Sequence, residues 1–270
     1  ILADYGIEPE EFEEQQLLRD VHRFKDKGKT TEGIFAPWAI YKSDFQKING
    51  HDPLYAPQSK EDSDIFNRFL LAGYEFVQTW EGFVYHMTCR GSRFADGAKR
   101  NPDGEVFMKN RETDEWLAQN IRSTRNFIRK WGHFVKHDKF LKPIVPPKYN
   151  VGFVVKNCSQ SALHELEPWC STIYTDWGHK TYVGEEQKNT MFDLTKRVKS
   201  KIECKPDNDI IIKFDVKELT QEQFNIITQL SEILSNDEEL EVGEFNLGIF
   251  EIEVKKIKTY EEDLIKCENK

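Results

Sequence analysis

Three prolines within five residues, Pro143, Pro146 and Pro147, constrain the fold of this chain more than any other feature. Proline fixes its own φ angle and has no backbone N–H, so the segment 143–148 cannot be a helix and is typical of a stiff linker. We therefore predict two domains, at 1–142 and 149–270. With 270 residues, of which 38% are hydrophobic, the chain is long enough to give each part its own core.

The charge of the chain limits the ligands that it can bind. A net charge of −9 argues against a dedicated nucleic-acid-binding protein, which normally carries a basic surplus. The charge is unevenly distributed: residues 86–148 contain 14 Lys/Arg and 7 Asp/Glu, whereas residues 203–270 contain 8 and 18. We expect the middle of the chain to meet an anionic ligand and the C-terminal part to repel one.

Cysteine usage and hydropathy indicate the compartment. The cysteines are odd in number, scattered and never in Cys-x-x-Cys spacing, which predicts neither a zinc site nor a disulfide framework, and favours a reducing cytoplasm. The apolar runs are too short to span a membrane, and the N-terminus lacks the pattern of a signal peptide. The five cysteines are Cys89, Cys158, Cys170, Cys204 and Cys267.

The second predicted domain alternates between strand and helix patterns. Such an order in about 120 residues is typical of a small α/β or α+β module. Strands are predicted at 149–157, 171–174, 209–215 and within 245–257, and helices at 191–201 and from Thr220 onward.

In the first domain, the clearest element is a helix that ends at Gly73. Ser59 and Asp62 have the spacing of a capping box, and a single apolar face follows. The first turn carries Glu61, Asp62 and Asp64, where the helix dipole favours negative charge. A structural role as helix cap and a chemical role are both open for this cluster, and for Asp64 we favour the cap.

The remainder of this domain is predicted to contain a β-hairpin and a long helix. Strands at 74–80 and 83–87 would be joined by a tight turn, and an exposed loop would follow at 90–104. The long helix is predicted over 112–136. The possible inward positions are apolar: Trp116, Ile121, Phe127, Ile128, Trp131 and Phe134. The basic residues belong mostly to other faces: Arg122, Arg125, Arg129 and Lys130.

Chemically suitable side chains surround the predicted Ser59 helix. His51 and Asp52 lie in the proline-rich loop before it, and His86 ends the second predicted strand. A carboxylate at a helix start can accept a proton from a hydroxyl, and imidazole with carboxylates can hold a divalent metal ion. Arg90 and Arg93 can bind phosphates in a bidentate manner. The structural alternatives are a hydrogen-bonded core histidine and a solvated basic loop.

One further histidine pair is a weaker candidate. His133 and His137 are four residues apart on the predicted long helix, where both could ligate a metal ion. No glutamate stands where a His-Glu-x-x-His hydrolase needs one, so we do not favour a metal site there.

Residues 33–148 resemble the C-terminal half of a family 2-like glycosyltransferase with the GT-A fold, of the type found in phages, giant viruses and metagenomes. The resemblance depends on an ordered set of cues rather than on one motif. They are Asn49-Gly50-His51-Asp52-Pro53-Leu54-Tyr55, Glu61-Asp62, Arg68, Gly73-Tyr74, Trp80-Glu81-Gly82-Phe83-Val84-Tyr85-His86-Met87 and Arg90-Gly91-Ser92-Arg93-Phe94.

The resemblance implies an inverting transfer of a sugar from a nucleotide-sugar donor to a glycan or another hydroxyl acceptor. It assigns the base that deprotonates the acceptor to Asp62, with Glu61 in support. It further assigns divalent metal binding (Mn²⁺ or Mg²⁺) to His86. On the same basis Arg90 and Arg93 would hold the donor diphosphate, and the acceptor-side loop residues would be His51, Asp52 and Trp80.

The chain departs from this family before residue 33. The family's N-terminal half supplies the nucleotide pocket and an Asp-x-Asp metal motif, and we find neither there. We therefore expect an α/β chain with a partial GT-A-like domain, inactive alone if the other half is missing, followed by an accessory module at 149–270. The expected location is the cytoplasm, or the host cytoplasm for a viral protein.

Two alternatives stay open. One is a non-catalytic binding or scaffold module in which the acids only cap a helix. The other is a metal-dependent hydrolase or nuclease, which would need its ligands within about 5 Å of one ion. Its candidate ligands are Asp52, Asp62, Asp64 and His86.

Overall fold

The computed structural model describes residues 4–6, 10–85, 99–100, 106–107, 114–176, 179–236 and 240–267. The contacts between residues divide the chain into two compact units. The first consists of residues 1–39, 75–121 and 137–142, and the second of residues 40–74, 122–136 and 143–270. Helix α4 (Asp114–Trp131) begins in the first unit and ends in the second.

The proline-rich linker opens the last segment of the second unit. That unit also takes in residues 40–74 and 122–136, which the sequence assigned to the glycosyltransferase-like domain. A compact unit and an evolutionary domain need not coincide, so the boundary at 143–148 stays a prediction.

The first unit contains helix α1 (Glu14–Phe24) and short strands: β1 (Thr30–Thr31), β2 (Gln78–Thr79), β3 (Lys99–Arg100) and β4 (Val106–Phe107). The predicted hairpin of residues 74–87 is wrong for its described part. β2 pairs instead with β1, antiparallel, and residues 82–85 are not a strand. The backbone of Trp80 extends this pairing, because its N–H donates to Lys29 O (3.1 Å) and its carbonyl accepts from Asp26 N (3.0 Å).

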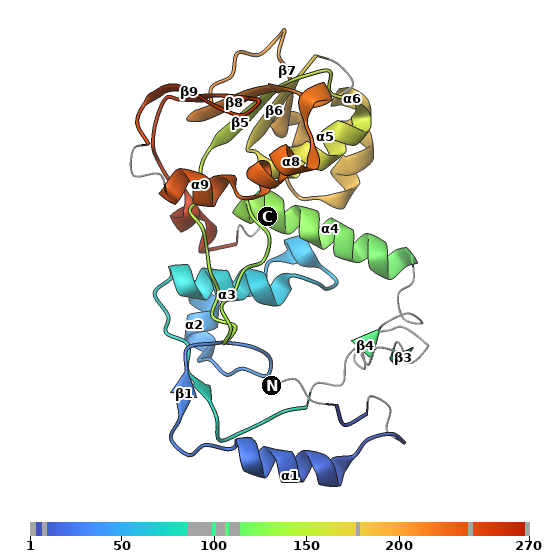
Figure 1. The fold of residues 1–270 in the computed structure, drawn as a ribbon, viewed down its shortest axis with the longest axis vertical. Coiled ribbons are helices and arrows are strands. Elements are labelled where there is room, and N and C mark those ends of the chain that lie inside the picture. The colour runs from blue at the N-terminus through green and yellow to red at the C-terminus, as the bar shows by residue number, and fades with distance from the viewer. Residues whose placement is uncertain are drawn as a thin grey trace. The chain divides into compact units, whose positions relative to one another are not determined.

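The second unit is built on a six-stranded, mostly parallel sheet (Figure 1). Its strands are β5 (Val151–Lys156), β6 (Thr172–Thr175), β7 (Val198–Ser200), β8 (Ile210–Asp215), β9 (Gly243–Leu247) and β10 (Phe250–Val254). The order is β7-β6-β5-β8-β10-β9. β7, β6, β5 and β8 pair in parallel, and β10 pairs antiparallel with both β8 and β9. The α/β prediction is confirmed at this level. The three parallel strands predicted at 149–157, 171–174 and 209–215 are present because continuous apolar runs favour buried strands.

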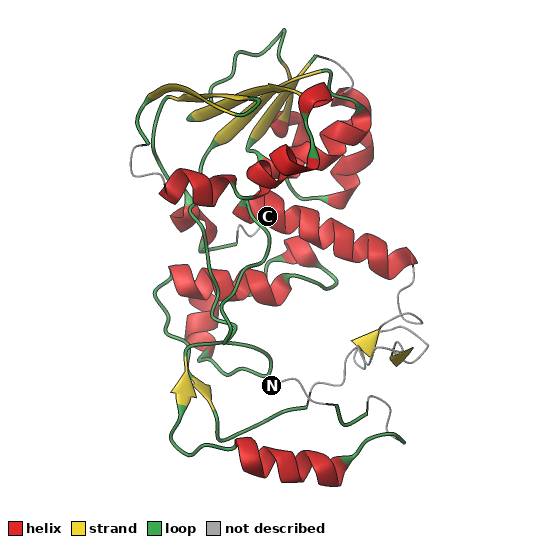
Figure 2. Ribbon diagram, viewed as in Figure 1, coloured by secondary structure: helices red, strands yellow, loops and turns green. Residues whose placement is uncertain are grey.

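Helices cover one face of this sheet, as Figure 2 shows in red. They are α5 (Gln160–Leu166), α6 (His179–Glu186), α7 (Leu194–Arg197), α8 (Gln221–Thr228) and α9 (Leu230–Asn236). The capping box of Thr220 and Gln223 starts α8 at the predicted place. The predicted helix at 191–201 is wrong in its second half, because Val198 and Ser200 are buried as part of β7.

The chain crosses the other face of the sheet between β7 and β8. Asn208 in this crossing lies so close to Gly152 that a Cβ there would be 2.3 Å from Asn208 Oδ1. Tyr174 donates to Asn208 Oδ1 (3.1 Å) from the same face. Glycine is therefore required at this position of β5, which explains a glycine inside an otherwise apolar strand.

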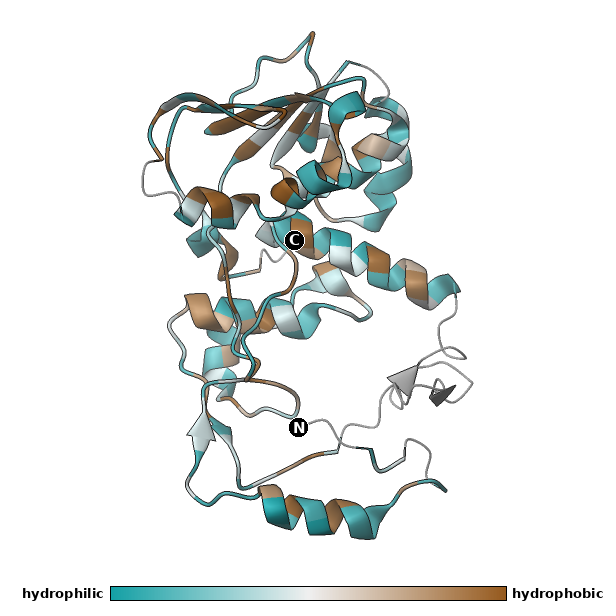
Figure 3. Ribbon diagram, viewed as in Figure 1, coloured by the Kyte–Doolittle hydropathy of each residue, from teal (hydrophilic) through white to brown (hydrophobic). Residues whose placement is uncertain are grey.

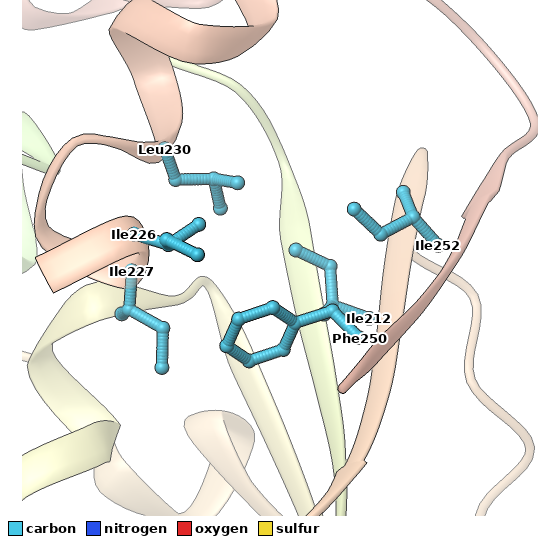
Figure 4. Close-up of a pocket in the computed structure, with 6 residues that line it drawn as sticks. All are labelled: Ile212, Ile226, Ile227, Leu230, Phe250 and Ile252. Atoms are coloured by element: carbon cyan, nitrogen blue, oxygen red, sulfur yellow. The ribbon is translucent and has the colours of Figure 1, made fainter. Parts of the chain in front are cut away.

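Apolar side chains fill the space between the sheet and its helices, and the central strands β5 and β8 are mostly brown, that is hydrophobic, in Figure 3. Phe153 is fully buried at the centre of this core. Where α8 and α9 meet the sheet, a void of about 10 Å³ remains (Figure 4). It holds at most about one water molecule and is no ligand site. Its lining residues are Ile212, Ile226, Ile227, Leu230, Phe250 and Ile252.

The second unit also contains α2 (Lys42–Lys47) and α3 (Glu61–Leu71), together with the C-terminal half of α4. Short 3-10 helices complete the chain: η1 (Pro53–Tyr55), η2 (Glu167–Trp169), η3 (Gln187–Asn189), η4 (Val216–Glu218) and η5 (Glu261–Leu264). Among the described residues, no helix is long and apolar enough to cross a membrane. The described cysteines, Cys158, Cys170, Cys204 and Cys267, are all free.

Candidate active site

The predicted catalytic acids lie in the first turn of α3. Glu61 and Asp62 are both half-buried, and the Oε2 atom of Glu61 is shielded from solvent without a hydrogen-bond partner. The helix is confirmed, but its predicted cap is wrong. Ser59 and Lys60 have φ angles of 78° and 73°, so the N-cap is Lys60, and its side chain makes no capping hydrogen bond.

Asp64 is the acid whose predicted role the structure corrects. It is not a solvent-facing cap, because its side chain is fully buried. Its Oδ2 accepts from Arg68 Nε at 2.8 Å, and its Oδ1 accepts from Trp131 Nε1 at 2.9 Å and from Tyr55 OH at 3.2 Å. Burial, and then the charge of Asp64, raise the pKa of Tyr55 well above its usual value. The carboxylate is thus a fixed structural anchor.

Arg68 connects α3 to the loop before it. The guanidinium is fully buried, and besides Asp64 it donates to Ile48 O (2.8 Å) and Gly50 O (2.7 Å). Its hydrogen bonds therefore join the Asn49-Gly50 turn directly to the last turn of α3. A buried guanidinium with several matched acceptors fixes both segments in one geometry, because any movement would leave a buried charge unpaired.

Lys130 of α4 joins the same cluster. Its Nζ lies 2.8 Å from Asp52 Oδ2 and 2.7 Å from Asp64 Oδ1. Burial raises the pKa of Asp52, but Lys130 and the N–H of Leu54 outweigh it, and the pKa lies below its ordinary value. Asp52 was predicted as an acceptor-side residue; in the structure its carboxylate N-caps η1 and pairs with Lys130.

Other α4 residues hold the loop that leads into α3. Arg122 donates to Ala56 O at 2.8 Å, and Ser123 donates to Gln58 O at 3.1 Å. Asn126 reaches Leu54 O at 3.4 Å. The loop that leads into α3 is therefore held by side chains of α4.

A divalent metal ion does not fit this cluster. Asp52, Asp64 and Cys267 offer ligand atoms within 4.8 Å of one another, and no other group of three such residues was found among those that the structure describes. However, the ammonium of Lys130 already bridges the two carboxylates. Burial raises the pKa of the Cys267 thiol to about 11, and Mg²⁺ and Mn²⁺ prefer oxygen ligands. The ammonium takes the place that a hard cation would need.

The other predicted site residues do not all belong to one unit. His51 is exposed, with its ring edge-on to Phe45 at 5.6 Å between centroids. Trp80 belongs to the first unit, where its Nε1 donates to Thr31 Oγ1 (3.1 Å) and Lys29 Nζ lies 3.9 Å from the ring centroid. The donor-side and metal predictions fall outside the described residues: His86, Arg90 and Arg93.

The weaker histidine pair loses its helical basis, because α4 ends at Trp131. His133 is 2% exposed, and its Nδ1 lies 2.6 Å from Phe134 O. Burial lowers the pKa of His133 to about 4. His137 is exposed and belongs to the first unit.

A second buried ion network, missed by the sequence analysis, lies on another side of α4. Glu167 is fully buried and accepts from Arg129 Nε (2.9 Å) and Arg197 Nε (2.6 Å). Arg129 also pairs with Glu186 at 2.6 Å, and Arg125 pairs with it at 3.0 Å. Burial raises the pKa of Glu167, but the arginines prevail and hold it at about 2. The sequence analysis placed these arginines on other faces of α4 than the apolar residues but missed their burial, and the missed signal was the acids 167 and 186 in the other predicted domain.

Comparison with known proteins identified no relative of this chain. No protein-family model, no curated protein and no solved structure matches the chain.

The two aspartates in the first turn of α3 differ in burial, and this difference indicates what the site can do chemically. Asp64 is buried, and its carboxylate is taken up by cationic and hydrogen-bonding partners. Asp62 is half-buried, so one carboxylate remains within reach of a molecule from solvent. Such an arrangement can present an acceptor of protons at a fixed position.

Proposed function

We propose that this chain is the acceptor-side, catalytic-base part of an inverting glycosyltransferase of the GT-A type. Its substrates would be a nucleotide-sugar donor and an acceptor hydroxyl. The observation that supports the proposal is the first turn of α3, where half-buried Asp62 lies two residues from the fully buried anchor Asp64. A general base must be held within hydrogen-bond reach of the proton that it removes, and the anchor holds its helix rigidly.

In the proposed reaction, the Asp62 carboxylate takes the proton of the acceptor hydroxyl. The hydroxyl oxygen attacks the anomeric carbon from the face opposite the diphosphate. A new C–O bond forms, the bond to the diphosphate breaks, and its electron pair leaves with the nucleoside diphosphate. Glu61, half-buried beside Asp62, would accept a hydrogen bond from the acceptor.

Donor recognition belongs to the residues predicted from the sequence resemblance. Arg90 and Arg93 would neutralise the diphosphate, and His86 would be the metal ligand. The Asp52, Asp64 and Cys267 cluster does not serve that purpose, so we assign no reaction step to a metal ion there. Asp62 is not a member of that cluster, so the described residues do not form the shared ion site of Asp52, Asp62 and Asp64 that a carboxylate-based hydrolase or nuclease would need.

The test compares Asp62→Asn with Asp64→Asn in the protein that carries this chain. Nucleoside diphosphate release and sugar transfer are measured across UDP-, GDP-, dTDP- and ADP-sugars. Asp62→Asn should keep the wild-type melting temperature within a few degrees and lose about 10²–10⁴-fold in turnover, because it removes only the base. Asp64→Asn should instead lower the melting temperature, because it disturbs buried ion pairs.

Glu61→Gln is the matched neighbour control. It should retain more turnover than Asp62→Asn, because an amide oxygen still accepts a hydrogen bond. Turnover by Asp62→Asn within about twofold of wild type contradicts the base assignment. A wild-type protein that consumes none of the donors contradicts the transferase and favours a binding or scaffold module.

A further inference from the structure

Strand β9 is an edge of the six-stranded sheet. Within the described part of the chain, it pairs with β10 on one side and with no strand on the other. Just beyond the β8–β10 pairing, Lys255 N donates to Asp209 O. Because the backbone hydrogen bonds of an antiparallel pair alternate along the strand, the N–H and C=O groups of the odd-numbered residues of β10 point toward β8, and those of the even-numbered residues point toward β9. In the β9–β10 register, the N–H and C=O groups of Glu244 and Asn246 therefore point away from the sheet.

The side chains of the same two residues border a hollow on one face of the sheet. Its volume is about 390 Å³, and it is lined mainly by charged groups. Glu244 pairs with Glu253, and Asn246 pairs with Glu251, so these four side chains point to the same face. Lys213, opposite Glu251 on β8, is the one basic residue of the lining.

Among the described residues, the acidic charge of the hollow is balanced only in part, by Lys213 and Lys255 at Glu253. Lys213 lies 3.5 Å from Glu253, while no ion pair of Glu244 or Glu251 occurs among the described residues. The described residues 240–254 contain four Asp/Glu and no Lys/Arg. The open backbone edge therefore lies in a strongly acidic environment.

We propose that β9 is a docking edge for an extended, basic segment of a partner protein. The segment would add a seventh strand through the outward backbone groups of Glu244 and Asn246. Alternate Lys or Arg side chains of the segment would enter the hollow and meet Glu244 and Glu251. Backbone pairing gives affinity in this mode, and the pocket for alternate side chains gives the preference for a basic sequence.

Charge decides between this occupant and a second copy of the chain. Antiparallel pairing of β9 with itself would bring two acidic segments together, and like charges across a strand pair are destabilising. Acidic edges commonly prevent such association between copies. A basic strand removes the repulsion, and the hollow provides room for its side chains.

The proposal uses residues of β8, β9 and β10 and none of α3, so it is independent of the proposed transferase activity. The probe is a fluorescein-labelled seven-residue peptide in which lysine alternates with threonine and valine. Its binding to the full chain is followed by fluorescence polarisation. We expect saturable binding that weakens about tenfold between 50 and 300 mM NaCl, and no binding of the matched peptide with glutamate in place of lysine.

Two variants separate backbone pairing from charge. Asn246→Pro removes an outward N–H and should weaken binding at least tenfold, whereas Asn246→Ala keeps the N–H and should bind within about twofold of wild type. Glu251→Lys should also weaken binding. As a measurement that does not depend on the folding of a variant, the same basic peptide with every backbone nitrogen methylated should fail to bind wild-type protein.

Equal binding of the methylated peptide would overturn the proposal, because charge alone would then explain the affinity. Equal binding of the glutamate peptide would overturn it as well. Sedimentation provides the last check: a dimer of wild-type protein that Asn246→Pro dissociates would show that the edge binds a second copy instead.

Discussion

Two regions of the second unit are stabilised in different ways. The sheet and its helices enclose an apolar core centred on Phe153, in which burial of hydrophobic surface supplies the stability. The region of α3 and α4 instead encloses charges, with Asp64, Arg68 and Lys130 buried side by side. Buried ion pairs contribute little net stability but penalise every misplaced partner. The first region thus provides stability, and the second provides a precise geometry next to Asp62.

The largest effect that would test this comparison is expected from Arg68→Ala. Truncation leaves Asp64 with one less cation in a site without solvent, so the free energy of unfolding should fall by about 3–5 kcal/mol. Urea denaturation measures it. Arg23→Ala is the control, because the Arg23 side chain is 77% exposed in its pair with Asp20 and should cost no more than about 1 kcal/mol. Similar losses for both variants would contradict a special role for the buried cluster.

The pH dependence of stability is the next largest effect. The arginines hold the pKa of Glu167 at about 2, below its usual value of 4.5. A lowered pKa means that the folded state binds the proton less readily than the unfolded state. The stabilisation is therefore complete above about pH 4.5 and is lost as the pH falls toward about 2. Unfolding at a series of pH values should show this loss, and Glu167→Gln should flatten it. An unchanged slope in Glu167→Gln would assign the acid sensitivity to other carboxyl groups.

Shape-conserving substitutions should affect the two regions unequally. Ile212→Val removes one methylene from the apolar core and should cost about 0.5–1.5 kcal/mol. Asp64→Asn changes almost no volume, yet it leaves Arg68 and Lys130 short of one negative charge and should cost about 2–3 kcal/mol. Chemical denaturation of both variants gives the ranking. The reverse order would mean that the α3–α4 region is stabilised by packing rather than by charge.

The smallest effect is expected at Tyr55. Tyr55→Phe removes one hydroxyl, which lies 3.2 Å from Asp64 Oδ1, and should lower the free energy of unfolding by about 1 kcal/mol. In an Asp64→Asn background the same substitution should cost clearly less, because the charge-assisted hydrogen bond is already weakened. A double-mutant cycle measures this coupling, and strict additivity would show that the hydroxyl and the carboxylate act independently.

Sequence patterns predicted the elements in which local preference and tertiary burial agree. β5, β6 and β8 were found because each is a short apolar run. α8 was predicted to begin at Thr220, and the structure shows a capping box of Thr220 and Gln223 there. The helix α3 was predicted correctly because its apolar residues form one face and a glycine, Gly73, follows its end. Residues 191–201 were misassigned because helix α7 and strand β7 follow each other without a punctuating residue.

The candidate site was predicted less well, because charge does not reveal burial. Arg129 was placed on another face of α4 than the apolar residues, and its burial was missed because arginine is usually exposed. Glu167, from a distant part of the sequence, makes that burial possible. Asp64 was interpreted as a cap because it lies in a first helical turn. Its partners Lys130 and Trp131 lie more than sixty residues further along the chain.

The sequence by itself determined that the chain is α/β, that helix α3 begins with a cluster of acids, and that the C-terminal part of the chain is acidic. These properties follow from periodicity and composition, which are local. Only the tertiary structure decided which acid is the anchor and which faces solvent, because that depends on where α4 places its cations. It also decided that β9 is an edge strand, since no pattern within Gly243–Leu247 indicates which neighbour it lacks.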